Sequence, residues 1–594
     1  MQSCFISFGI SFFRCFVGFA FGYIRSFITP VLDTQRSNIK KFLMENKALT
    51  LKAMIKKHRP KNLDPRSWMR PETVKGFADF VLDKDSDKET DNSFDNKEML
   101  LDAEKQFMEA AKRNDVENMK ILSKGLNANA KNVNHRTALH YAVAGKNKEA
   151  AQFLLQRRVK VDQKDKYGVA PIHLAAWFGS LDILKLLVQA GAEQKVENEE
   201  GLNILHCAAI NNHTDIVEYI INDLQMKELD KDDKSGHRAF ALAAEHGCVQ
   251  MLEMLMDPYE MATMKPNKRG DTPLHLAARN GHLDTVQLLL QSFDTRDEVN
   301  MDGKTALYQA ADNGQEECVL ALLEANCDPN ILTVTKDSTL HPVAERGDTS
   351  LVQLLLEYKA NTDFQNQHLE APLHLAVKNS HIPVIHSLLM AGCNINVTDK
   401  RSQTAMHLAA ELATIDVVEL LLKAGLDLTL QDRQGKTALG VAARANEAII
   451  VDMIIKAERY YAWRMANPEL NESVHNENPL TFKLDHRYET RQLRSMAWRL
   501  AYELLKPGDW KRLAEQWNFT KEQMSAIEEQ WTGQQSYQEH GNRMLLIWLH
   551  GEELAQKNPA KELYHGLIAT GNRKAADKIR TEEESASSKS CSIS

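Results

Sequence analysis

A short phrase returns ten times through the middle of this 594-residue chain. In its fullest form it reads Thr272-Pro-Leu-His-Leu-Ala277, and its copies begin 33 residues apart except for two intervals of 35 and 34 residues. A fixed period of this length predicts small helical or hairpin units that stack, because no single unit can bury its own apolar face. The copies begin at Thr137, Ala170, Asn203, Arg238, Thr272, Thr305, Ser338, Ala371, Thr404 and Thr437.

Each copy predicts two short helices. The phrase runs through small apolar residues into a turn, and a second apolar stretch such as Val286-Gln-Leu-Leu-Leu290 follows. Apolar residues at positions i, i+3 and i+4 indicate amphipathic helices. Gly and Pro number 27 and 16, which is about 7% against a usual ~12%. The scarcity of turn formers disfavours a β-sandwich or barrel, so we expect an all-α fold.

The phrase resembles the T-P-L-H-x-A motif of ankyrin repeats, which is intact at Thr272–Ala277. The resemblance covers residues 104–463 and implies an ankyrin-repeat α-solenoid of helix-turn-helix units with hairpin tips. Phe107–Asn114 is similar to a degenerate first copy and is predicted to cap the stack, since a terminal repeat needs one polar face. The resemblance also implies that hairpin tips and inner helices bind a protein partner.

The repeated histidines predict structural hydrogen bonds rather than chemistry. No repeat contributes more than one of these histidines, and neighbouring repeats lie about 10 Å apart. The ligands of a metal must instead all lie within about 2 Å of one ion. Gly303-Lys-Thr305 lacks the earlier Gly of a phosphate-binding loop. No catalytic pair, metal site or cofactor is expected, and the protein is not predicted to be an enzyme. The seven residues are His140, His173, His206, His275, His341, His374 and His407.

Departures from the repeat pattern mark candidate partner contacts. A Gly at the hairpin tip, two residues before the phrase, is replaced in three adjacent copies by Lys336, Leu369 and Ser402. A residue other than Gly there must accept an awkward backbone or reshape the turn. Either a specialised binding stretch or sequence drift explains the change. Asn330, with an acid two residues and a Leu eight residues before it, is similar to asparagines hydroxylated in some ankyrin repeats; a structural hairpin role is the alternative.

A second unit follows a polar linker at residues 464–483. Its apolar spacing predicts six short helices within residues 484–580. The phrases Asp509-Trp-Lys-Arg-Leu-Ala514 and Met544-Leu-Leu-Ile-Trp548 resemble those of a death domain. That resemblance implies a six-helix death-domain bundle, no catalysis, and binding to other death-domain proteins through charged patches. Candidate surface residues are Arg491, Arg494, Lys511 and Arg512.

The two ends of the chain differ in composition from the repeats and from the C-terminal unit. Residues 1–35 form an apolar leader whose Arg14 fits neither a secretory signal nor a membrane span well, so an unstructured or isoform-specific segment is expected. Residues 36–103 form a second leader segment, which is basic and then acidic. Residues 581–594 form a Ser-rich tail whose Cys591-Ser-Ile-Ser594 fits a prenylation motif. The protein contacts a membrane only if Cys591 is lipidated or the leader inserts.

Charge and domain content together predict a cytoplasmic, non-enzymatic adaptor for intracellular signalling. Residues 104–480 hold 39 basic and 52 acidic residues, within a net charge of −8 for the chain, so nucleic acid would be repelled. An ankyrin stack followed by a death domain resembles the ankyrin repeat and death domain-containing proteins. The stack would bind one protein and the bundle would recruit death-fold partners. The alternative is a membrane-tethered scaffold held by a prenyl group on Cys591.

Overall fold

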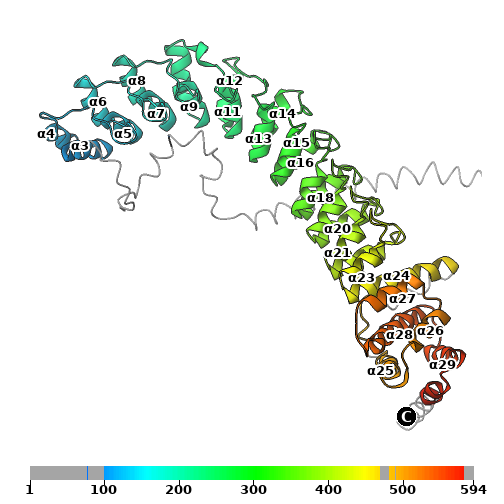
Figure 1. The fold of residues 1–594 in the computed structure, drawn as a ribbon. Helices are drawn as coiled ribbons and strands as arrows, with labels where there is room; N and C mark the ends of the chain where they lie inside the picture. Colours follow the sequence, from blue (N-terminus) through cyan, green and yellow to red (C-terminus); the bar gives the residue numbers. More distant parts are fainter. Residues whose placement is uncertain (1–76, 78–99, 468–479, 488–489, 581–594) are drawn as a thin grey trace, which may run out of the picture. The chain divides into compact units, whose positions relative to one another are not determined.

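The computed structural model describes residue 77 and residues 100–467, 480–487 and 490–580. All regular elements within these ranges are helical, and they follow one another as pairs along most of the chain (Figure 1). One pair comes from the degenerate copy that contains Phe107–Asn114, and one from each of the ten copies of the phrase. The predicted all-α repeat architecture is therefore confirmed.

The first helix of each pair begins within the phrase or, in the degenerate copy, just before Phe107. These helices are α3 (Asp102–Lys112), α5 (Ala138–Ala144), α7 (Pro171–Phe178), α9 (Ile204–Ile210), α11 (Ala239–Glu245), α13 (Pro273–Asn280), α15 (Ala306–Asp312), α17 (Leu340–Arg346), α19 (Pro372–Lys378), α21 (Ala405–Glu411) and α23 (Ala438–Arg444). Each packs against the first helix of the next pair, and their surface is called the first-helix surface below.

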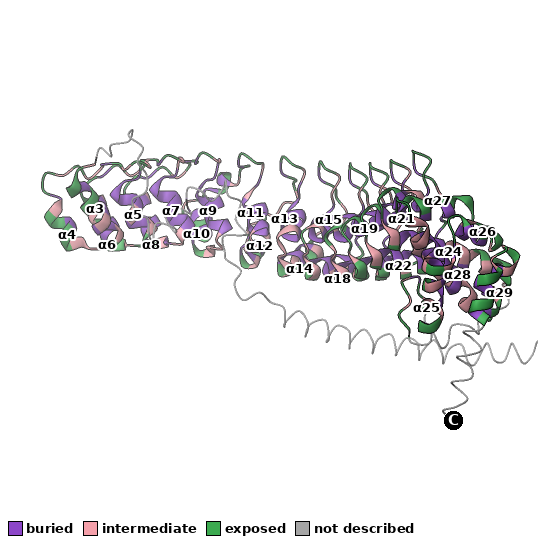
Figure 2. Cartoon of the chain, turned by 60° about the horizontal axis from the view of Figure 1, so that its bottom comes forward, coloured by how far each residue is buried: buried purple, intermediate pink, exposed green. Residues whose placement is uncertain are grey.

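The second helices form the other layer. They are α4 (Val116–Leu122), α6 (Lys148–Gln156), α8 (Leu181–Gln189), α10 (Thr214–Glu218) with the π-turn η2 (Tyr219–Asp223), α12 (Val249–Met256), α14 (Leu283–Ser292), α16 (Glu316–Glu324), α18 (Thr349–Glu357), α20 (Ile382–Met390), α22 (Ile415–Ala424) and α24 (Ala448–Ala466). The short helix η3 (Lys227–Leu229) lies in the 35-residue interval. Figure 2 shows the buried residues along the helices and the hairpins in a row along one edge.

Buried imidazoles join neighbouring copies. In α7, the Nδ1 atom of His173 accepts a hydrogen bond from the Ala170 N–H at 3.1 Å, and Nε2 donates to the Val196 carbonyl of the following hairpin at 3.1 Å. The same pair of bonds recurs at the other six histidines of the phrase. The predicted structural role of these residues is confirmed. Because both ring nitrogens are engaged in this way, the imidazole is neutral.

Consecutive hairpins are also joined at their tips. The Val334 N–H donates to the Asp302 carbonyl at 2.9 Å, and the Gln367 N–H donates to the Thr335 carbonyl at 2.9 Å. The residue that ends each tip has a positive φ, whether it is Gly303 at 72° or Leu369 at 57°. The non-glycine residues therefore accept the left-handed backbone, as predicted, and the turn keeps its shape.

Asn330 connects two hairpins through its side chain. Its Oδ1 accepts from the Asn361 N–H at 2.7 Å, and its Nδ2 donates to the Lys359 carbonyl at 3.3 Å. Asp297 and Asp363 accept the equivalent bond from the residue 31 positions further on. This arrangement is the structural hairpin role; hydroxylation of Asn330 stays a prediction.

The helices after the stack are α25 (Arg491–Arg499), which continues into the π-turn η5 (Leu500–Leu504), α26 (Asp509–Gln516), α27 (Lys521–Glu529), α28 (Ser536–Leu554) and α29 (Pro559–Ala569), followed by helical residues 573–580. They are called the C-terminal bundle below. Trp510 and Trp548 are buried, as expected for core aromatics. The side chain of Phe482, within the predicted linker, is also buried, and it lies 5.8 Å from the Tyr460 ring.

The C-terminal bundle packs directly on the last helix pair. Helix α28 contacts α24, and α27 contacts both α23 and α24. At this contact the Arg543 guanidinium pairs with the Asp452 carboxylate at 2.6 Å and donates to the Ala448 carbonyl at 3.1 Å. Gln530 donates to the Ala443 carbonyl at 2.8 Å. The bundle thus covers the end of the stack that would otherwise be open.

Several sequence predictions fall outside the described residues. They concern the apolar leader 1–35, residues 36–76 and 78–99, the linker residues 468–479, and the tail 581–594 with Cys591. Within the described part of the chain, no helix combines the length and the apolar character needed to cross a membrane.

The neutral histidines predict acid sensitivity. Burial lowers the pKa of His173 to about 4, so between pH 6.5 and 4 the unfolded chain binds a proton that the folded chain does not. The free energy of unfolding will therefore fall as the pH falls through this window, by up to about 3 kcal/mol for this residue. We expect His173→Gln to flatten the dependence in urea unfolding at pH 7, 6 and 5. His565→Gln, at an exposed position of α29, controls for the change of residue type, and an unchanged slope in His173→Gln would contradict the account.

The tips predict opposite effects for two substitutions. A Cβ on Gly303 would lie 2.7 Å from the Val334 nitrogen, so Gly303→Ala will lower the free energy of unfolding, by about 1–3 kcal/mol. Leu369→Gly will raise it by about 1 kcal/mol, because Leu369 is exposed and holds a left-handed backbone. Urea unfolding measures both. A Leu369→Gly chain that is less stable than the original would show that the Leu side chain stabilises the tip.

The Asp452–Arg543 pair predicts non-additive costs. Arg543→Leu leaves a half-buried carboxylate without its partner, so it will lower the free energy of unfolding by about 2 kcal/mol. Adding Asp452→Asn will recover part of this loss. Lys511→Leu is the control, because the Lys511–Glu528 pair is exposed and worth less than about 1 kcal/mol. Hydrogen exchange of α24 and α28 reports the docking, and strictly additive costs would refute the coupling.

Candidate partner-binding surface

One position of the repeat defines the character of the first-helix surface. It lies seven residues after the first residue of the phrase, in the last turn of each first helix. The ten residues at this position are called the surface row below. Its first three members are apolar and the other seven are charged. In order they are Ala144, Trp177, Ile210, Glu245, Arg279, Asp312, Glu345, Lys378, Glu411 and Arg444.

The apolar end of the surface row is firmly positioned. Trp177 ends the apolar run of α7, and its carbonyl accepts a hydrogen bond from His213 Nε2 of the next copy at 3.0 Å. Trp177 and Ile210 are each 6% exposed. A large aromatic side chain held at this position offers an apolar contact for a partner side chain.

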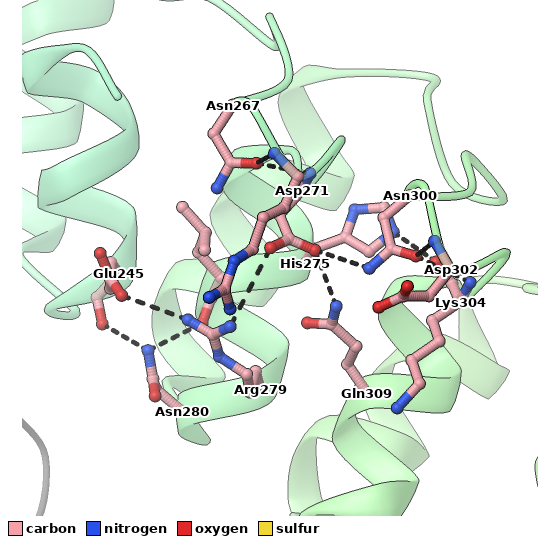
Figure 3. Close-up of polar contacts among 12 residues, drawn as sticks. Glu245, Asn267, Asp271, His275, Arg279, Asn280, Asn300, Asp302, Lys304 and Gln309 are labelled. Atoms are coloured by element: carbon pink, nitrogen blue, oxygen red, sulfur yellow. Dashed lines mark hydrogen bonds and ion pairs between the residues drawn. The ribbon is translucent and has the colours of Figure 1, made fainter. Parts of the chain in front are cut away.

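The middle of the surface row is a buried polar network (Figure 3). The Arg279 guanidinium in α13 pairs with the Glu245 carboxylate of α11 at 3.2 Å. Asp271, in the hairpin before α13, accepts hydrogen bonds from Asn300 Nδ2 and Gln309 Nε2, both at 2.8 Å. These bonds link α11, α13 and α15.

Asp271 remains ionised within this network. Burial would raise the pKa of its carboxyl group, but the hydrogen bonds from Asn300 and Gln309 outweigh burial and hold the pKa below its ordinary value. The carboxylate is therefore committed to these amides. The network thus holds Asp271 in a fixed position between neighbouring copies.

The far end of the surface row is charged and open. Glu345, Lys378, Glu411 and Arg444 are exposed, and their signs alternate along the stack. Lys378 forms an ion pair with Glu370 of its own copy. Alternating exposed charges favour a polar partner surface of matching pattern.

The structure separates the predicted partner residues into two groups. Lys336 and Leu369 are exposed and Ser402 is half-buried, on three successive hairpin tips. In the C-terminal bundle, Arg491 and Arg494 lie on α25, whereas Lys511 and Arg512 lie on α26. Three of these four form ion pairs. Arg494 pairs with Asp485, Lys511 with Glu528, and Arg512 with Asp509.

A groove lies beside the contact between the stack and the C-terminal bundle. Its volume is about 1210 Å³, and it is lined by α24, by residues of the hairpin before α23 and by the start of α27. Glu458, on its wall, accepts a hydrogen bond from Gln523 Nε2 at 2.8 Å. Burial raises the pKa of Glu458 to about 7. The groove has Tyr461, Met465 and Trp517 among its apolar residues.

No group of three or more His, Cys, Asp or Glu residues in the described ranges could hold a metal ion. The cysteines described there are buried, and burial raises the pKa of each thiol above its ordinary value. They act as small apolar side chains. They are Cys207, Cys248, Cys318, Cys327 and Cys393.

Trp177 and the Asp271 network were not predicted from the sequence. Trp177 belongs to an apolar phrase, Ala170-Pro-Ile-His-Leu-Ala-Ala-Trp177, that reads as core. The signal that identifies it is the column of the repeat: seven later copies carry a charge where Trp177 stands. The bonds of Asp271 join residues 29 and 38 positions apart, and only the stacking register brings them together.

Comparisons with known proteins agree with this geometry. The family model for ankyrin repeats (3 copies) matches residues 107–198, 173–265, 260–333, 325–399 and 373–462. The chain is 27% identical over 163 residues to ankyrin repeat protein nuc-2 of Neurospora crassa, and 30% identical over 167 residues to the nuclear factor NF-kappa-B p105 subunit of Gallus gallus. Each match covers 27% of this chain, and 15% and 17% of the relatives.

A third relative is the human transient receptor potential cation channel subfamily A member 1, 27% identical over 31% of this chain and 14% of its own length. The chain thus matches less than a fifth of each of these relatives. Among solved structures, the ankyrin repeat domain of Bcl-3 is 25% identical, with a TM-score of 0.34, and covers 37% of this chain and 99% of its own. Ankyrin repeats generally bind protein partners. Because the family model matches more than half of its length, the chain belongs to the ankyrin repeat family.

Proposed function

We propose that this protein is a non-enzymatic intracellular scaffold for signalling. The ankyrin stack binds one protein partner through its first-helix surface and hairpin tips. The C-terminal bundle recruits a second partner of the death-fold class. The observation that carries the first part is the surface row, whose character changes from apolar to charged along one continuous face.

A graded surface suits one extended partner. The apolar end at Trp177 can bury an apolar side chain, which contributes most of the free energy in a typical protein interface. The charged end, from Glu345 to Arg444, contributes alignment and selectivity, because wrongly placed charges repel. The hydrogen-bonded network between them holds the middle of the surface in place before a partner arrives, and a preorganised surface loses little entropy on binding.

The second part of the proposal rests on the resemblance of the C-terminal phrases to death domains. The six helical segments of the bundle and the buried Trp510 and Trp548 support it. On α25, Arg491 is exposed, and α25 contacts the bundle through η5 and α28. We place the recruiting face there, because α27 and α28 are already occupied by the stack.

We expect two changes of equal charge to have different effects on partner retention. Glu345→Arg/Glu411→Arg reverses two charges of the surface row, whereas Glu324→Arg/Glu357→Arg does the same on the exposed second helices. Quantitative mass spectrometry of proteins retained by the full chain will show a set of partners reduced at least tenfold by the first pair. The second pair will leave that set unchanged.

Equal retention by all three chains, or a loss caused only by Glu324→Arg/Glu357→Arg, would refute binding at the first-helix surface. Arg491→Glu, on α25, tests the bundle separately. It is expected to remove death-domain proteins from the retained set and to leave the stack-dependent set in place. Circular dichroism of each variant checks that the fold is unchanged.

A further inference from the structure

Phe77 precedes the stack in the sequence, and its ring lies against Trp177. The two ring centroids are 3.9 Å apart, and the ring planes differ by 6°, so the rings are stacked. Phe77 is 1% exposed. Residue 77 precedes the first repeat helix by 25 residues, whereas Trp177 lies in the third helix pair. The contact therefore joins the leader to the first-helix surface.

The partner ring of Phe77 is the unusual member of the surface row. An Arg or Lys of the row could hold an aromatic ring only through a cation–π contact, whereas Trp177 stacks with Phe77 ring on ring. Trp177 offers the largest apolar face available to any side chain, and the neighbouring Ile210 and Ala144 extend the apolar end of the row. The His213 ring hydrogen-bonds to the Trp177 carbonyl at 3.0 Å and so positions the backbone that carries the indole.

We propose that the first-helix surface at Trp177 is a binding site for an aromatic side chain, and that Phe77 of the same chain is its occupant. The site recognises the flat apolar face of the ring rather than a charge. Because Phe77 is tethered, its effective concentration at the site is in the millimolar range, and a free peptide competes poorly with it.

Binding of Phe77 at Trp177 does not depend on the proposed function. Only its consequence for a partner rests on that function. If a partner uses the apolar end of the surface row, its own aromatic side chain must displace Phe77. Binding of Phe77 itself needs no partner, and a test with a peptide from this chain separates the two statements.

The test uses a fluorescent peptide with the sequence of residues 73–83, which contains Phe77, and the full chain as receptor. In the Phe77→Ala chain the site is vacated, so we expect the peptide to bind at least tenfold more tightly than to the unaltered chain by fluorescence anisotropy. Adding Trp177→Leu, which keeps an apolar side chain, is expected to weaken peptide binding to the Phe77→Ala chain by at least tenfold.

Two controls make the result specific. The Phe94→Ala chain removes a different leader Phe and is expected to behave as the unaltered chain. A peptide in which Phe77 is replaced by Ala is expected not to bind. Equal binding to the unaltered and Phe77→Ala chains, binding insensitive to Trp177→Leu, or no binding to the Phe77→Ala chain at 1 mM peptide, about the effective concentration of a tethered segment, would each overturn the proposal.

Discussion

The imidazole that crosses from one repeat to the next is the interaction on which the rest of the structure depends. In α13 the Nδ1 atom of His275 closes the start of the helix, and Nε2 holds the Lys304 carbonyl of the next hairpin at 2.9 Å. A single side chain thus sets both the local turn and the register of its neighbour. Because these bonds are buried, their loss leaves the Thr272 N–H without its partner, and the Lys304 carbonyl then keeps only the bond from the Asn300 N–H. The stack is therefore a chain of nearest-neighbour contacts, and seven of the repeat copies contribute such a neutral histidine.

This register gives the protein its functional face. Residues that repeat every 33 positions fall into rows, so one position per copy decides the character of the first-helix surface. The row passes from Trp177 and Ile210 through the Glu245–Arg279 pair to the exposed charges beyond Glu345. The C-terminal bundle closes the other end through Arg543, and the groove beside this contact adds a second concave region. The stacking of the repeat copies therefore determines both the stability of the protein and the surface on which a partner would bind.

The fold was largely predictable because the repeat is local and periodic. The helix pairs, the role of the histidines and the left-handed tips at Lys336, Leu369 and Ser402 follow from patterns within one or two copies. The Asp452–Arg543 pair and the Phe77–Trp177 stack were not predictable, because their partners lie 91 and 100 positions apart. Periodicity within a repeat carries no information about how a leader or a bundle docks on it. The resemblance implied that hairpin tips and inner helices bind a partner, but individual residues of the stack were predicted only at the tips, because departures from Gly were compared there and the surface row was not.

The central claim is that a protein partner binds along the first-helix surface. Hydrogen exchange of the full chain, measured alone and with its most strongly retained partner, tests this claim directly. The account predicts slower exchange in the last turns of first helices such as α7, α13 and α19 and at the adjoining hairpins, with the second helices unchanged. Slower exchange confined to the second helices, or to the C-terminal bundle alone, would contradict it.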